Sequence, residues 1–249
     1  MNLPFLKAKS AELRRAKLER EATAMWVEVL HTQRDDVRLS LGITKASMGT
    51  GTWRPPPRTG DFSILDYRAL LAPTTILASL RAAEFALQRG AALGVFDAAS
   101  NTTIEKRRAE MAGAVALEWG RGEAPGAVSV VDRTSVRRIA LLLGAWVLGR
   151  EMFTMDDDLD SLYADSRAAT IGVTLVSTGY VEGLKTVYRN DGKTKSLSWV
   201  TMGDERMCPV CGPLHGQVGT LEGVFPGGQS APVHARCRCY YRPFIGERG

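Results

Sequence analysis

CPVCG at residues 208–212 and HARCRC at residues 234–239 are the two motifs that decide how the C-terminal part of this chain folds. All four cysteines of the chain lie in these motifs, so cysteine is absent elsewhere. A Cys-x2-Cys turn closed by glycine points two thiolates at one ion, and a His-x2-Cys turn can supply two further ligands. The two turns together predict a tetrahedral Zn2+ site.

The motifs offer more ligands than one zinc ion needs. Five residues can each supply a ligand atom: Cys208, Cys211, His234, Cys237 and Cys239. The first two cysteines and Cys237 are the clearest candidates, so His234 and Cys239 compete for the fourth position. His234 has the better spacing for a paired turn, whereas His215 follows Cys211 so closely that both would compete for the same space.

A closed structural zinc site fits these residues better than a disulfide or a catalytic centre. We expect no secretory signal peptide, because the first residues lack a long apolar run, and a reducing compartment favours metal over disulfides. Catalytic zinc keeps an open position near a general base. Here thiolates dominate and no His-Glu-x-x-His motif occurs in the sequence, so we expect no enzymatic activity.

Composition sets broad limits on the fold and on its partners. The chain has 249 residues, of which 45% are hydrophobic, and its net charge is +5. This mild excess of positive charge permits contact with nucleic acid or an acidic partner without requiring it. The longest apolar run, residues 139–148, is half a membrane span and therefore predicts a buried helix, with no membrane partner.

The N-terminal part is predicted to be a helix over residues 6–47, with a break near His31. Apolar residues at helical spacing form one stripe: Ala22, Met25, Trp26, Val29 and Leu30. Such a stripe would be a liability on a lone monomer, so we expect a partner to cover it, with folding back onto residues 61–150 as the alternative. The basic first turns are interpreted as a solvated helix face, with a DNA-binding arm as the alternative.

Proline and glycine divide the chain into four predicted parts. Three consecutive prolines in residues 48–60 exclude a helix there and mark a linker. The predicted domains are an N-terminal helical arm, this linker, a helical domain and a C-terminal β-hairpin and zinc module: residues 1–47, 48–60, 61–178 and 179–249. The predicted fold class is mostly α with a small β/zinc-knuckle module, α+β overall.

Within the helical domain, turn and cap residues suggest where the helices begin and end. A stripe from Ile76 to Leu87 marks the first helix, and the Thr102-x-x-Glu105 capping box predicts the start of the second. The glycines and proline of residues 120–126 are expected to end that helix, and Asp132 or Thr134 to start another.

The acidic run at residues 155–160 is interpreted as the first turn of a further helix that ends near Ser177. After Gly179 the pattern changes, and residues 186–188 and 197–200 are predicted to be two strands around an Asn-Asp-Gly turn. Residues 239–244 are predicted to return as a closing strand.

A series of short motifs runs through residues 167–244. They are Arg167-Ala168 with Ile171 and Thr174, then Gly179, Trp199-Val200-Thr201, Asp204-Glu205-Arg206, Cys208-x2-Cys211, Leu214-x-Gly216 and Pro232-x-His234-x2-Cys237-Arg238-Cys239. In this order they resemble the Mu F-like minor head proteins, also called phage head morphogenesis proteins. The chain has Thr174-Leu175 where that family usually has Thr-Glu, so no role of that acid carries over.

The resemblance implies a minor component of a tailed-phage head, made in the host cytoplasm and incorporated into the virion near the portal vertex. It implies a role in head assembly and in DNA packaging or ejection, with no known catalysis. The implied partner is the portal protein, with major capsid protein, scaffolding protein or packaged DNA as further candidates.

The alternative from the residues themselves is a nucleic-acid-binding zinc module, in which Arg236, Arg238 and Arg242 would contact phosphates. A metal-dependent hydrolase has less support, because the sequence shows no paired carboxylates, nucleophile elbow or phosphate loop.

Limited proteolysis tests the predicted linker. We expect the first cut between Met48 and Asp61, because a segment rich in proline and glycine does not join a packed element. Mapping the cut by mass spectrometry checks this, and full resistance of this segment would mean that it is packed.

Overall fold

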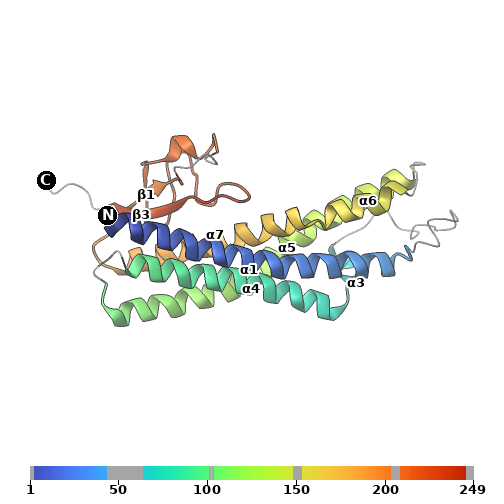
Figure 1. Cartoon of the computed structure of the whole chain (residues 1–249), viewed down its shortest axis with the longest axis horizontal. Coiled ribbons are helices and arrows are strands. Elements are labelled where there is room, and N and C mark those ends of the chain that lie inside the picture. The colour runs from blue at the N-terminus through green and yellow to red at the C-terminus, as the bar shows by residue number, and fades with distance from the viewer. Residues whose placement is uncertain are drawn as a thin grey trace.

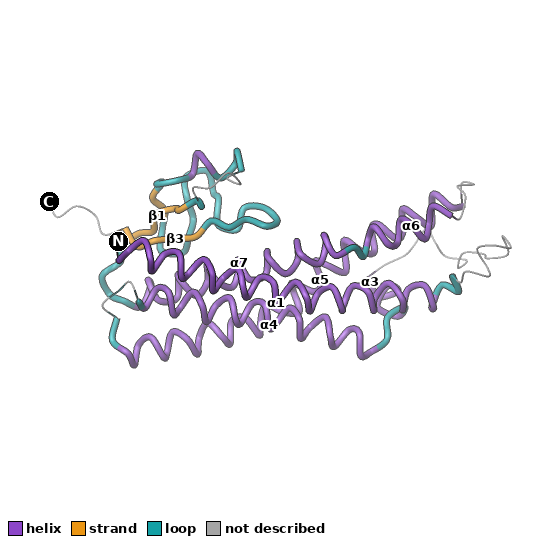
Figure 2. Tube along the Cα trace, viewed as in Figure 1, coloured by secondary structure: helices purple, strands orange, loops and turns teal. Residues whose placement is uncertain are grey.

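Long helices lie side by side along one axis and form an elongated body, and a small sheet sits at one end of it (Figures 1 and 2). This computed structural model describes residues 3–43, 64–100, 102, 104–147, 153–202 and 208–244. The helices are α1 (Leu3–Ser40), α3 (Ile64–Ala69), α4 (Pro73–Ala99), α5 (Lys106–Val147), α6 (Phe153–Leu162) and α7 (Asp165–Asn190).

The sheet is antiparallel, has the strand order β2-β1-β3, and lies beside the start of α1 (Figure 1). Its strands are β1 (Ser196–Val200), β2 (Val218–Gly219) and β3 (Tyr240–Phe244). The central strand pairs Trp199 with Tyr241 on one side and Leu197 with Gly219 on the other. A mostly α fold with a small C-terminal β module is therefore confirmed, and so is the closing strand.

Glycines hold α4 and α7 unusually close together. A Cβ atom on Gly90, Gly94, Gly179 or Gly183 would overlap a backbone carbonyl oxygen of the opposite helix. Gly172 faces the backbone of α1 in a similar way, where a Cβ would lie 2.8 Å from a backbone nitrogen. Since any side chain would push the helices apart, these positions fix α7 against α4 and α1.

This packing corrects the prediction that Gly179 ends a helix. Because the glycine is used for close approach, α7 runs on to Asn190, and residues 186–188 are helical instead of forming a strand. The Asn-Asp-Gly turn does occur, but it caps the helix: Asp191 accepts hydrogen bonds of 2.8 Å from the backbone N–H groups of Lys193 and Thr194. The predicted boundary between residues 178 and 179 therefore lies inside α7.

The apolar stripe of α1 is covered by the protein's own helices. Trp26 and Leu30 have no exposed surface and belong to the same core cluster as residues of α4, α5 and α7. The expectation that a partner covers this stripe is therefore wrong, and the alternative of folding back is correct. No break occurs at His31, whose Nε2 lies 2.9 Å from Asp165 Oδ1. The helix ends at Ser40 instead of residue 47, and the predicted linker, residues 48–60, lies outside the described residues.

Helix α5 continues through the predicted stop at residues 120–126. Ala124 and Val128 are buried in the core there, and Pro125 lies on the exposed side, so packing outweighs the local break signal. Asp132 and Thr134 consequently lie inside α5 and do not start a helix. The helix begins at Lys106, slightly later than its predicted capping box.

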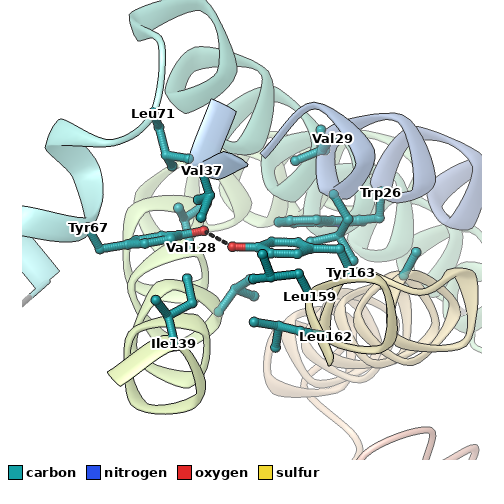
Figure 3. Packing of buried hydrophobic residues seen from close by; sticks show 14 of the residues in the cluster. Trp26, Val29, Val37, Tyr67, Leu71, Val128, Ile139, Leu159, Leu162 and Tyr163 are labelled. Carbon is teal, nitrogen blue, oxygen red and sulfur yellow. Dashed lines mark hydrogen bonds between the residues drawn. The ribbon is translucent and has the colours of Figure 1, made fainter. Parts of the chain in front are cut away.

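The acidic run lies in α6, which is separate from α7, so one predicted helix is in fact two. Buried residues of α5 and Tyr67 pack against their junction in one hydrophobic cluster (Figure 3). The hydroxyl groups of Tyr67 and Tyr163 lie 3.2 Å apart. Arg167 donates hydrogen bonds to Ser135 Oγ at 2.9 Å and to the Leu162 carbonyl at 3.0 Å, and burial lowers its pKa. The Arg-Ala motif thus has a structural use.

Replacement of Gly183 by alanine tests the close approach of α4 and α7. We expect Gly183→Ala to lower the free energy of unfolding by about 2 kcal/mol, because the added methyl group meets backbone atoms that cannot move aside. Urea unfolding followed by circular dichroism measures this.

The matched control is Gly144→Ala in α5, where a Cβ meets no atom within 4 Å. That variant should be more stable by up to about 1 kcal/mol, because alanine is the better helix former. Equal effects of the two substitutions would contradict the account.

Candidate metal centre

A tight turn presents the first two thiols. The backbone N–H groups of Cys211 and Gly212 donate to the Cys208 carbonyl at 3.1 and 3.0 Å, and the Cys211 N–H also lies 3.2 Å from Cys208 Sγ. The short helix η2 (Gly212–Leu214) follows at once. This is the geometry that the Cys-x2-Cys-Gly spacing predicts, and it fixes both sulfur atoms on one side of the turn.

A second turn presents the imidazole and a third thiol. Cys237 N–H donates to the His234 carbonyl at 3.1 Å, which closes the turn. His234 Nδ1 lies 2.8 Å from the Ala235 carbonyl. A carbonyl oxygen only accepts hydrogen bonds, so Nδ1 carries the proton and Nε2 offers its lone pair. That Nε2 atom lies 3.0 Å from Cys208 Sγ and 3.1 Å from Cys211 Sγ.

The structure brings together all five predicted ligand residues. They form two overlapping groups, each with ligand atoms within 4.8 Å of one another: Cys208, Cys211 and His234, and Cys211, Cys237 and Cys239. The shared residue Cys211 lies 3.9 Å from Cys237, sulfur to sulfur. Zinc–sulfur bonds of about 2.3 Å in a tetrahedron place two sulfur atoms about 3.8 Å apart, so this pair needs little movement to bind an ion.

His215 does not join this cluster. Its Nδ1 accepts a hydrogen bond of 3.1 Å from the Thr201 backbone N–H and lies 2.9 Å from the Thr201 hydroxyl oxygen. Its ring therefore holds the chain that leaves β1. The Asp-Glu-Arg motif at residues 204–206 lies outside the described residues.

The thiols differ in how readily they lose a proton. A hydrogen bond from Cys239 lowers the pKa of Cys237 to about 5, and the same bond, together with burial, raises the pKa of Cys239. Burial and the neighbouring Cys208 raise the pKa of Cys211 to about 12. At Cys208 burial raises the pKa, but hydrogen bonds from Cys211 and Val210 outweigh it and lower the pKa overall. Cys237 is thus the most acidic of the four thiols.

Hydrogen bonds fasten the second turn to the helices. The Arg236 N–H donates to Thr174 Oγ1 of α7 at 2.9 Å. Arg15 of α1 donates to the Arg238 carbonyl at 3.2 Å and to Ser177 Oγ at 2.6 Å, and its side chain is buried. Sequence reasoning placed Arg15 on a solvated basic face and gave Thr174 no role in the cluster. Only the folded packing of α1, α7 and the turn reveals these contacts.

The module also has an aromatic core of its own. The ring centroids of Trp199 and Phe225 are 5.0 Å apart, and those of Phe225 and Tyr241 are 5.1 Å apart. These rings share one buried cluster with Cys211, Cys237 and residues of α4 and α7. The cluster therefore joins the cysteines, the sheet and the helical body.

Loss of the Thr174 hydroxyl should loosen this attachment. We expect Thr174→Val to reduce the free energy of unfolding by about 1 kcal/mol, because the Arg236 N–H then loses its acceptor. Thr178→Val is the control, since the Thr178 hydroxyl donates only within α7, to the Thr174 carbonyl at 2.8 Å. Thermal unfolding of both variants measures the difference, and an equal loss in the control would count against this contact.

Comparison with known proteins supplies the family. No curated protein and no solved structure matches the chain. Residues 146–242 match the family described as Phage Mu protein F like protein. This region contains α7, β1, β2, the first part of β3 and every residue of the metal cluster. The C-terminal region of the chain thus resembles the Phage Mu F-like proteins over the part that carries the metal cluster.

Proposed function

We propose that Cys208, Cys211, His234 and Cys237 bind one Zn2+ ion. Cys208, Cys211 and His234 place their ligand atoms together, and Cys237, the most acidic thiol, lies 3.9 Å from Cys211. Cys239 then acts from outside the coordination shell, as the hydrogen-bond donor to Cys237.

The proposed role of the ion is structural. Three thiolates and one imidazole complete a tetrahedral shell and leave no position for a substrate or a reactive water molecule. Because the ligand turns are tied to α1 and α7, binding of the ion stabilises the attachment of the module to the helical body. A non-enzymatic role follows from this ligand set.

Zinc content tests the assignment of the four ligands. Purified protein should contain about one zinc per chain, as expected for a single tetrahedral site. Cys237→Ser and His234→Ala should each lose most of the zinc, whereas Cys239→Ser should retain it. Elemental analysis after dialysis against a weak chelator measures this. If His234→Ala retained its zinc and Cys239→Ser lost it, Cys239 would be the fourth ligand in place of His234.

We propose that the protein is a non-enzymatic component of a phage head that binds the portal protein, where it supports head assembly and DNA packaging or ejection. The family match over residues 146–242 carries this proposal. Membership of a head protein family implies a place in the virion. Among the described residues, no helix has the length and apolar character needed to cross a membrane.

The portal-binding surface is proposed to lie on the zinc module. Burial of the α1 stripe removes that stripe as the docking surface. The module instead exposes apolar side chains, with 57% of Val210 and 47% of Val224 accessible. Exposed apolar side chains of this kind are typical of protein contacts when they gather on one small unit.

Co-purification with the portal protein of the same phage tests this surface. The double variant Val210→Asp, Val224→Asp should retain zinc but lose most portal binding. The control is Leu141→Asp, which changes an exposed apolar side chain of α5 and should leave portal binding normal. Normal binding by the double variant would move the surface elsewhere. Binding of DNA in place of portal protein, falling steeply with salt, would support the nucleic-acid alternative.

A further inference from the structure

Helix α5 carries more exposed large hydrophobic side chains than any other helix in the described residues. The described residues include thirteen exposed large hydrophobic side chains, and five of these lie on α5. These five are Met111, Val115, Leu117, Val130 and Leu141. Val115 and Val130 flank the middle of the helix, on the side that faces away from the core.

Two glycines lie between these valines on the same face. A Cβ at Gly122 or at Gly126 meets no atom within 4 Å, whereas the glycines of α4 and α7 touch the opposite backbone. Each glycine in a helix is less favourable than alanine by up to about 1 kcal/mol. Inside this chain, pairs of glycines four residues apart, Gly90 with Gly94 and Gly179 with Gly183, form the close contact of two helices. The pair on α5 has the same spacing and is open.

The charges beside the glycines fit a second copy of the same helix. In a pair of antiparallel α5 helices that cross midway between Gly122 and Gly126, Glu118 of one copy lies level with Val130 of the other. It is then one helical turn from Arg133 of that copy. Both charged side chains are exposed, and Glu118 pairs with Arg121 of its own helix at 3.0 Å. Two Glu118–Arg133 ion pairs form when Glu118 turns from Arg121 to Arg133 of the other copy. In a parallel crossing, Glu118 would instead lie beside Glu118 of the other copy, and Arg133 beside Arg133.

The same arrangement also brings the apolar residues together. Val115 of one copy lies one turn from Val130 of the other, so each end of the contact gains an apolar pair. We propose that the outer face of α5, from Val115 to Arg133, binds the same face of a second copy in an antiparallel, twofold-symmetric crossing. This surface is separate from the zinc module and from its proposed portal contact.

A single helix crossing buries little area compared with most stable interfaces. The dimer is therefore weak when the protein is free, and forms at high protein concentration. In an assembled head, where copies are held near one another, the same contact gains strength from the raised local concentration.

Sedimentation equilibrium of the purified full chain, from micromolar to submillimolar concentration, tests the proposal. The wild-type protein should show a reversible monomer–dimer equilibrium. Gly126→Leu should weaken dimerisation by about tenfold to a hundredfold, because the side chain prevents the close crossing. Gly144→Leu is the matched control: it makes the same change in open space on the same helix, far from the crossing, and should leave the equilibrium unchanged.

Exchange of the charges tests the antiparallel register. Glu118→Arg and Arg133→Glu should each weaken the dimer, and the double variant should restore it, since the two ion pairs then form with reversed signs. Circular dichroism confirms that each variant folds. A wild-type protein that stays monomeric, a dimer indifferent to Gly126→Leu, or a double variant that fails to recover would overturn the proposal.

Discussion

The direct backbone contact between α4 and α7 is the constraint on which the other contacts depend. Glycines on both helices remove the side chains that would separate them, and each backbone fills the space left on the other. The first half of α7 thereby packs into the core shared with α1 and α5, while its second half forms the base of the core beneath the sheet. One straight helix thus connects the long bundle with the metal cluster.

The metal cluster depends on this helix as much as on its own turns. The two ligand turns are local structures, but Thr174 of α7 and Arg15 of α1 hold the second turn in place. The aromatic core of the module is small, so the proposed ion would add stability that packing alone does not provide. The module and the bundle are therefore parts of one packed unit, which agrees with a family match that begins in the helices and ends in β3.

The sequence predicted best where the structure is decided by neighbouring residues. The spacing of Cys208, Cys211, His234 and Cys237 specifies two turns, and these turns form as predicted. The central and closing strands were also found, because Trp199 and Tyr241 lie in short β-favouring runs next to the cysteines.

Prediction failed where contacts between residues far apart in the sequence decide the structure. Glycine ends helices and also lets helices touch, and nothing in the local sequence of Gly179 distinguishes these uses. The stripe around Trp26 shows that α1 is amphipathic but cannot show which surface covers it. Arg15 lies in a basic segment whose composition is typical of a solvated helix face. Folding nevertheless buries it between the helices and the zinc module.

The coordination shell of the bound ion tests the central claim, which is a closed structural zinc centre that joins the module to the bundle. X-ray absorption at the zinc edge on the purified protein gives the number and type of ligands. The account predicts three sulfur atoms at about 2.3 Å and one nitrogen at about 2.0 Å. A shell with an oxygen from water, or with fewer than three sulfur atoms, would contradict it.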